Sequence, residues 1–269
     1  MKSFTIGKSF YKKEEKIIMH EILVKGTTLP EAYHLTLKAL SENHDIAPCT
    51  DYDTNQKEAS ITFVVENPLQ EPMISKFFIG DPHSLEQYRQ EMLDGILDFE
   101  VKRGNWDYTY HQRMEKQVPW IIEELKRNPD TRRAVIAIRA EDDLSSTSPA
   151  CLQILQYLIR NGKLHCKALF RSNDLAKATF MNAFALIMLQ KKIADAVGVP
   201  VGSYTHRANS LHVYENDYEM LDGYIRRIDA GGDLAYYYVG DWDEMMEEAK
   251  PEIAKMVESL RAKLKSSEN

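Results

Sequence analysis

The sequence is poor in cysteine, with only three among 269 residues: Cys49, Cys151 and Cys166. So small and odd a number excludes a disulfide scaffold of the kind that holds small secreted domains together. We therefore expect reduced thiols and a cytoplasmic protein. Since a reduced thiol can act as a nucleophile, one of the three is a candidate reactive residue.

The sequence also lacks long apolar runs and an excess of basic residues. No stretch approaches the roughly 20 apolar residues that span a bilayer, and residues 1–19 hold no uninterrupted signal-peptide core. We expect neither a membrane span nor a secretory leader. The 34 Lys and Arg stand against 41 Asp and Glu, which gives a net charge of −7. This balance argues against a stable nucleic-acid partner, although it permits one local anion site.

Several common chemical motifs are missing. There is no glycine-rich phosphate loop, no paired CxxC and no HExxH, so nucleoside triphosphatases, zinc ribbons and zincin proteases have no support. The eight histidines show no spacing typical of metal ligands, and we expect no metal.

The chain has no internal repeat and no Gly/Pro/Ser-rich linker, so we expect a single domain over residues 1–269. Hydrophobic periodicity predicts an order that mixes helices with non-adjacent strands. The expected strands are residues 17–25, 60–66, 134–140 and 201–214. The expected helices are residues 29–40, 84–99, 119–127, 175–197 and a charged surface helix over 241–265.

The clearest local feature is a β-hairpin. The β-prone runs 151–160 and 163–172 are joined by Asn161-Gly162, the pair preferred in two-residue turns. Cys151 would open the first strand, at the point where a loop enters it. This makes Cys151 the best-placed candidate nucleophile, although a cysteine at a strand start is more often a packed core residue.

Arginines near these strands form a candidate anion site. Arg132 and Arg133 precede one expected strand and Arg171 ends another, so their guanidinium groups could converge on an anion. On spacing alone, a solvated edge is the more common arrangement for such arginines. The polar run RSND, residues 171–174, could contact a ligand or cap the helix that follows.

Three further residues could touch a ligand or serve the core alone. Asn182 lies on an otherwise apolar helix and could read a pyrimidine edge or bond a backbone carbonyl. His212 and Tyr214 alternate along a strand, so they share one face and could contact a ligand together.

Taken together and in order, these residues resemble the thymidylate synthase family. The residues that carry the resemblance are Arg132-Arg133, Pro149-Ala150-Cys151, Gln156, Arg171-Ser172-Asn173-Asp174, Asn182 and His212-Val213-Tyr214. The likeness is greatest to the archaeal-type branch, because WDYTYHQR (106–113) resembles that branch's segment with an active-site tyrosine, here Tyr110. QYLIR (156–160) and SLHVY (210–214) are similar to segments of phage pyrimidine hydroxymethylases. The resemblance implies an α+β thymidylate synthase-like fold: helices pack a mixed β-sheet, and a sheet face forms a homodimer interface.

The resemblance implies a role for the thiol and the arginines. Cys151 would attack C6 of a pyrimidine nucleotide and make C5 nucleophilic. Arg171 and Ser172 would hold the 5′-phosphate, joined by Arg132 and Arg133 from the second subunit of a homodimer with shared active sites. The same cations would favour the thiolate form of Cys151.

The resemblance also implies how the nucleotide is read. Asn182 would bind the base, His212 and Tyr214 the sugar, and Gln156 would help order the phosphate and base side. An amide can donate to a carbonyl and accept from an N–H, which complements uracil. Because cytosine-modifying relatives have a carboxylate at the position of Asn182, and Ser172 favours deoxyribose, the implied substrate is dUMP.

The remaining implied roles concern the one-carbon donor and proton transfer. The donor would be 5,10-methylenetetrahydrofolate, with Asp174 in contact with its pterin, and the product dTMP. Tyr110 would join the active site. The family uses a glutamate on an early helix to move protons, here Glu91, with Glu86 as the second candidate; a raised pKa would suit this role.

Departures from the family pattern fall on the folate and lid side. Residues 175–181 lack a glycine that the best-known synthases have, and the sequence ends in KSSEN instead of a short aliphatic tail. The folate-stacking tryptophans and a phosphate-loop arginine near residues 49–57 are not identifiable. Because a weaker lid admits water, the alternative is a dUMP hydroxymethylase, or one acting on CMP or dCMP. A third hypothesis is a non-catalytic nucleotide- or RNA-binding homologue.

Overall fold

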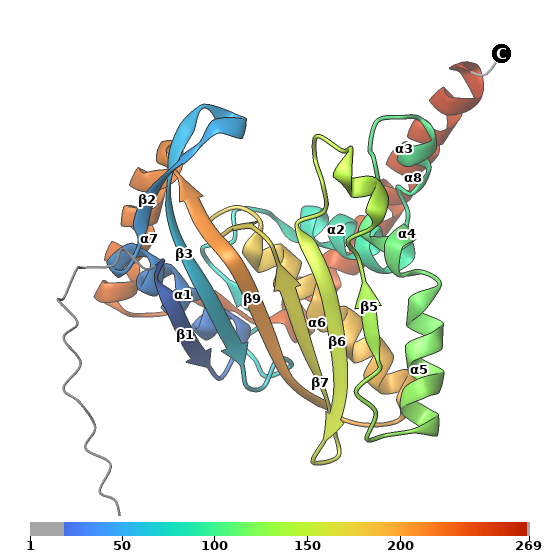
Figure 1. Cartoon of the computed structure of the whole chain (residues 1–269), viewed down its shortest axis with the longest axis horizontal. Coiled ribbons are helices and arrows are strands. Elements are labelled where there is room, and N and C mark those ends of the chain that lie inside the picture. Colours follow the sequence, from blue (N-terminus) through green and yellow to red (C-terminus); the bar gives the residue numbers. More distant parts are fainter. Residues whose placement is uncertain (1–18, 268–269) are drawn as a thin grey trace, which may run out of the picture.

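The computed structural model describes residues 19–267, and its centre is an eight-stranded mixed sheet (Figure 1). The main strands, in spatial order, are β1 (Glu21–Gly26), β3 (Thr54–Val65), β9 (Val201–Tyr214), β7 (Lys163–Phe170), β6 (Leu152–Arg160) and β5 (Val135–Ala137). β2 (Asp45–Cys49) pairs with β3, and β8 (Asn173–Asp174) pairs with β9. β1 runs parallel to β3, and both β7 and β8 run parallel to β9, while the other neighbours are antiparallel.

Helices cover one face of this sheet (Figure 1). They are α1 (Leu29–Glu42), α2 (Pro82–Asp94), α3 (Phe99–Lys102), α4 (Tyr110–Met114), α5 (Gln117–Arg127), α6 (Thr179–Val197), α7 (Tyr218–Ala230) and α8 (Asp243–Ser267). The long helix α6 is apolar almost all round, and Phe180, Phe184 and Ile187 are among its buried residues. Such a helix needs cover on every side, which the sheet and the outer helices provide.

The opposite face of the sheet carries no helix among the described residues (Figure 1). Paired positions form a row across it: Leu23, Thr62, Arg207, Leu169 and Ile154. Leu23 is 63% exposed and Ile154 is 38% exposed. The sheet is therefore open on one side, with apolar side chains in contact with solvent in the single chain.

The remaining elements are short. β4 (Ile74–Ser75) and β10 (Ala235–Tyr236) form a separate two-stranded sheet. The short helical turns are η1 (Thr50–Tyr52), η2 (Glu141–Leu144), η3 (Glu215–Asp217) and η4 (Tyr238–Trp242). Within residues 19–267, every helix is too short or too polar to cross a bilayer.

The expected hairpin is confirmed. β6 and β7 pair in antiparallel register up to Arg160 and Lys163, and the turn residues Asn161 and Gly162 have φ angles of 51° and 72°. Two consecutive positive φ angles are the type I′ geometry, whose twist matches that of the strands. The strand expected over residues 201–214 is likewise present as β9.

The expected end of the helix over residues 84–99 is wrong. α2 ends at Asp94, because Gly95 adopts the left-handed conformation with φ of 65°. A side chain is also excluded there, since a Cβ on Gly95 would lie 2.2 Å from His111 Nδ1. The chain turns at Gly95 and starts α3 separately.

The expected start of the helix from residue 175 is also wrong. Asn173 and Asp174 pair with β9 as strand β8, and residues 175–178 form a turn before α6 begins. The RSND run therefore enters a strand and does not cap α6. The sequence pattern does not predict β2, α4 or α7, and residues 17–18 of the first expected strand lie outside the described residues.

Candidate active site

Strand ends bring four candidate residues together. β6 begins where β7, β8 and β9 end, because β6 is antiparallel to β7 whereas β7 and β8 run parallel to β9. The Arg171 N–H donates to the Cys151 carbonyl (2.8 Å), and the Ser210 N–H donates to the Arg171 carbonyl (3.2 Å). Asp174 is the register partner of His212. The residues Cys151, Arg171, Asp174 and His212 thus lie together at one end of the central strands, and we call this end the sheet edge below.

The Arg171 side chain is anchored to the backbone just before Cys151. Its Nε donates to the Ala150 carbonyl (3.1 Å) and its Nη2 to the Pro149 carbonyl (2.8 Å). A guanidinium has five N–H groups, so these two bonds leave three for an anion. Arg171 is exposed, and Ser172 beside it is half-buried. This edge can therefore present a fixed positive charge to a phosphate.

Three tyrosines lie close to Cys151. The Tyr110 hydroxyl accepts from the Leu152 N–H (3.3 Å), and the rings of Tyr108 and Tyr110 are 5.6 Å apart. Burial raises the pKa of Tyr88, Tyr108 and Tyr110, and the negative charge of a Cys151 thiolate raises it further. All three phenols therefore keep their protons in neutral water and remain hydrogen-bond donors.

One of these tyrosines connects α2 to α6. Asn182, on α6, is buried, and its Oδ1 accepts a hydrogen bond from the Tyr88 hydroxyl on α2. Sequence reasoning missed Tyr88, which is one of 14 tyrosines and lies 94 residues from Asn182. No local motif could have identified it, because only the fold brings the two helices together.

The two candidate glutamates on α2 have different surroundings. Glu91 lines a pocket, burial raises the pKa of its carboxyl, and the Gln87 side chain donates to it (2.8 Å). Glu86 is 2% exposed and accepts two hydrogen bonds from Arg89 (both 2.7 Å) and one from Gln90 (2.8 Å). Five residues turn a helix through about 140° beyond one full circle, so the two carboxyls face different directions. Glu91 faces the candidate site, while Glu86 is held in an ion pair.

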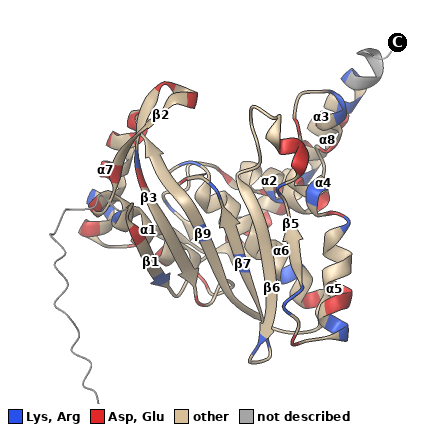
Figure 2. Ribbon diagram, viewed as in Figure 1, with Lys and Arg blue, Asp and Glu red and all other residues tan. Residues whose placement is uncertain are grey.

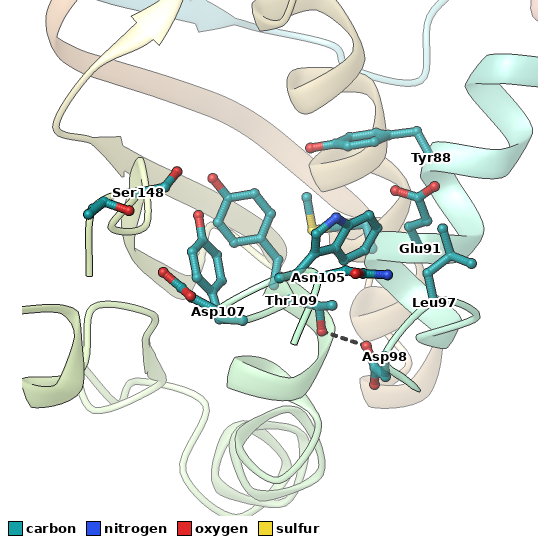
Figure 3. Close-up of a pocket in the computed structure, with 13 residues that line it drawn as sticks. Tyr88, Glu91, Leu97, Asp98, Asn105, Asp107, Thr109 and Ser148 are labelled. Carbon is teal, nitrogen blue, oxygen red and sulfur yellow. Dashed lines mark hydrogen bonds between the residues drawn. The ribbon is translucent and has the colours of Figure 1, made fainter. Parts of the chain in front are cut away.

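The pocket that Glu91 lines has a volume of about 430 Å³, and Figure 3 shows its walls. It is bounded by Tyr88, Glu91, Met92, Leu97, Asp98, Asn105, Trp106, Asp107, Tyr108, Thr109, Tyr110, Thr147 and Ser148. Three of these side chains are carboxylic and none is Lys or Arg. A volume of this size, with aromatic walls and a few polar groups, is typical of a small-molecule site. Sequence reasoning named the WDYTYHQR segment that forms one wall but only Tyr110 within it.

His212 has an unused acceptor. Its Nδ1 lies 3.2 Å from the Ser210 carbonyl, and its Nε2 is buried without a partner among the described groups. Burial lowers the pKa of His212, so the ring is neutral and, with the proton on Nδ1, Nε2 can accept. Burial also raises the pKa of the neighbouring Asp174, opposed by the Lys177 N–H. The His212 and Tyr214 rings are 4.8 Å apart.

Three predicted residues do not join this group within one chain. Arg132 and Arg133 are exposed just before the edge strand β5. The Gln156 side chain donates to the Arg132 carbonyl (3.1 Å), and Gln156 pairs with Val135 of β5. At about 3.3 Å per residue, Gln156 lies roughly 16 Å along β6 from Cys151. The structure therefore brings Gln156 to the arginines and not to the thiol.

The other two cysteines lie outside the group. Cys166 is fully buried in β7, where burial raises the pKa of its thiol to about 12. Cys49 is half-buried at the end of β2.

One cluster among the described residues has the composition of a cation site. Ligand atoms of Asp98, His111 and Glu115 all lie within 4.8 Å of one another. His111 Nδ1 is 2.7 Å from Asp98 Oδ2, and Thr109 donates to Asp98 Oδ1 (2.5 Å; Figure 3). These bonds already use the Asp98 carboxylate to hold one wall of the pocket together.

Cys151 and the anchored Arg171 thus lie where the central strands end, and the pocket that Glu91 lines also contains Tyr110, whose hydroxyl contacts the Leu152 N–H. Residues 83–261 match the sequence model described as thymidylate synthase. The match covers most of the chain, which therefore belongs to the thymidylate synthase family and has its α+β fold.

Individual proteins agree with this assignment. A protein of Methanocaldococcus jannaschii named "Putative thymidylate synthase" is 31% identical over 216 residues, which are 76% of this chain and 96% of the relative. A thymidylate synthase of Bacillus subtilis subsp. natto is 30% identical over 142 residues, 52% of this chain and 50% of that protein. The solved structure of the thermostable thymidylate synthase A from Bacillus subtilis is similar in fold, with a TM-score of 0.61, 20% identity, and coverage of 78% of this chain and 87% of that one.

Proposed function

We propose that this chain transfers a one-carbon unit from 5,10-methylenetetrahydrofolate to C5 of dUMP and produces dTMP. The observation that carries the proposal is the position of Cys151: it lies next to the fixed Arg171 guanidinium and close to three protonated tyrosines, in a member of the thymidylate synthase family.

In the proposed reaction, the Cys151 thiolate adds to C6 of the base, and the electron pair of the C5–C6 double bond moves to the C4 carbonyl oxygen. C5 then becomes the nucleophile. The Asn182 amide, which lies in the same region through its bond to Tyr88, would donate to the oxygen as its negative charge grows. When the adduct collapses, the pair that formed the Cys151 bond returns to the sulfur.

The sheet edge would hold the rest of the nucleotide. Arg171 supplies three free N–H groups for a phosphate dianion, and Ser172 stands beside it. The unpaired Nε2 of buried His212 would accept a hydrogen bond from a sugar hydroxyl, and the Tyr214 ring, which packs against the His212 ring, would line the same sugar site. A buried acceptor without a partner costs free energy, so a ligand hydroxyl there is favourable.

Glu91 is the proposed proton-transfer group. The proton on C5 must leave after the carbon–carbon bond forms, and Glu91 combines a raised pKa with a position on the pocket wall. Tyr110, whose hydroxyl is held by the Leu152 N–H, would assist as a neutral donor. Glu86 is the weaker candidate because Arg89 and Gln90 already occupy its carboxylate.

The 430 Å³ pocket is the proposed folate site, and its residues fit a pterin. Trp106 and Tyr108 offer aromatic faces, while the carboxylates of Asp107 and Glu91 can accept from pterin N–H groups. Asp174, close to the same edge, is a further proposed contact. When bound, the reduced folate supplies the methylene carbon and the hydride that reduces it to methyl.

We further propose a homodimer formed through the open face of the sheet. Figure 2 shows the charged residues mainly on helices and at strand ends, and little charge along the central strands. Apolar side chains such as Leu23 and Ile154 would then be buried. Arg132 and Arg133, which are exposed and far from Cys151 in their own chain, would reach the phosphate of the second copy.

A dUMP hydroxymethylase is the second candidate, because the pocket is open to water. Trp106 is 40% exposed, and α8 extends beyond the body of the molecule near α3 (Figure 1). Water that reached the exocyclic methylene would give a hydroxymethyl product in place of methyl.

The deciding experiment is the mass of the nucleotide made from dUMP and methylenetetrahydrofolate. dTMP together with dihydrofolate supports the first proposal, and hydroxymethyl-dUMP with tetrahydrofolate supports the second. Cys151→Ala should abolish both products, whereas the matched variant Cys49→Ala should keep them. If folded Cys151→Ala retained the wild-type rate, or if wild type bound nucleotide without any turnover, the enzymatic proposal would be refuted.

A further inference from the structure

The hydrogen bond between Tyr88 and Asn182 has a consequence for base choice. Asn182 is 6% exposed, and the bond from Tyr88 is the one side-chain hydrogen bond found for its amide within the described chain. The amide is therefore held from α2 at its oxygen. Its two N–H groups and the second lone pair of Oδ1 remain for a ligand.

In this pair the Tyr88 hydroxyl must be the donor, because otherwise its hydrogen would have no hydrogen-bond acceptor. It is buried, and the negative charges of Glu91 and Cys151 add to burial in raising its pKa, so the hydroxyl keeps its single hydrogen. No second hydrogen bond of this hydroxyl is present among the described residues. If the Asn182 amide turned over, its N–H would meet the phenol oxygen and the phenol hydrogen would have no acceptor. The observed orientation is therefore favoured.

A fixed amide distinguishes uracil from cytosine. Uracil presents a carbonyl oxygen at C4 and an N–H at N3, which match an amide N–H and the free lone pair of Oδ1. Cytosine presents an amino group and a bare nitrogen at these positions, so donor would face donor. The wrong pairing leaves buried polar groups without partners, and sites of this kind discriminate strongly between similar ligands.

We propose that Tyr88 is a specificity-determining positioning residue: by fixing the Asn182 amide it makes the site select uracil over cytosine nucleotides. The inference rests on the proposed nucleotide site. It assigns to Tyr88 a role in choosing the base, apart from any role in holding α2 against α6.

The test is Tyr88→Phe, which removes one oxygen atom and keeps the ring. Dissociation constants of dUMP and dCMP are measured by calorimetry on the full chain, with the melting temperature as a check on folding. Loss of one buried partner predicts a weakening of dUMP binding by about five- to a hundredfold, with dCMP binding unchanged or tighter because the amide can now turn. The preference for dUMP should therefore fall at least fivefold.

Tyr157→Phe is the matched control, because Tyr157 is also a buried tyrosine but neither lines the pocket nor bonds Asn182. It should leave the ratio of the two dissociation constants as in wild type. An unchanged ratio in Tyr88→Phe, or an equal loss of both nucleotides with the fold intact, would overturn the inference while leaving the proposed function in place. If wild type bound neither nucleotide, the proposed function itself would fail, and this inference with it.

Discussion

The Arg171 guanidinium offers the sharpest test of the nucleotide site. Its two hydrogen bonds go to the backbone carbonyls of Pro149 and Ala150, and the side chain is exposed. Arg171→Ala should therefore lower the free energy of unfolding by only about 1 kcal/mol, because water replaces exposed hydrogen bonds. Binding should suffer more. Each hydrogen bond to a charged group contributes about 1.5–3 kcal/mol, so losing one from the phosphate weakens dUMP binding about 10- to 150-fold.

The assay compares dUMP with deoxyuridine, which has the same base and sugar but no phosphate. Arg171→Ala should raise the Kd for dUMP and leave that for deoxyuridine nearly unchanged. The Kd of Arg171→Lys for dUMP should lie between those of wild type and Arg171→Ala, because lysine keeps the charge without the paired N–H groups. Arg160→Ala is the matched control, since Arg160, on the same hairpin, also donates to two backbone carbonyls, those of Ile159 (2.6 Å) and Asp130 (3.4 Å). Equal losses for nucleotide and nucleoside would refute a phosphate role.

Further predictions concern the glutamates and the dimer. Glu91→Gln should reduce kcat about 10²- to 10⁴-fold. Because burial raises the pKa of Glu91, the folded protein binds this proton more tightly than the unfolded chain and becomes less stable as pH rises through the folded-state pKa. Glu91→Gln should therefore raise the melting temperature near pH 7, and an unchanged melting temperature would contradict this. Glu86→Gln should lower the free energy of unfolding by about 1–3 kcal/mol in urea melts, because it removes the nearer of the two carboxylates paired with Arg89. The folded variant should keep its kcat, and a large loss of kcat would instead make Glu86 catalytic. Inactive Cys151→Ala and Arg133→Ala chains should regain activity when unfolded and refolded together, but not when refolded apart, if active sites are shared.

The parts of the fold that local chemistry determines could be predicted from the sequence. Asn161-Gly162 defines the hairpin turn, and the alternation over residues 201–214 defines β9. Periodicity alone could not predict the end of α2 or the start of α6, because each boundary depends on a local backbone conformation or pairing that the apolar pattern does not encode. In α2 it is the left-handed Gly95 against His111, and in α6 it is the pairing of residues 173–174 with β9.

The candidate site divides in the same way. Cys151 and Arg171 lie on one hairpin, so a strand–turn–strand pattern already places them side by side. Tyr88 and the pocket wall come from segments whose meeting depends on how α2 packs on α6. The choice between Glu86 and Glu91 likewise depends on which face of α2 meets the pocket. The sequence of α2 is only weakly amphipathic, so its apolar pattern does not reveal which face this is.

The hairpin geometry also determines where the chain can be lengthened. Cys151 and Arg171 face each other at the open end of the two strands, and the Asn161-Gly162 turn is about 30 Å away at 3.3 Å per residue. One residue inserted within either strand would shift the register and turn alternate side chains to the other face, separating the thiol from the guanidinium. The same residue added at the turn would leave both where they are. The turn is therefore a suitable position for a fused peptide or a fluorescent label.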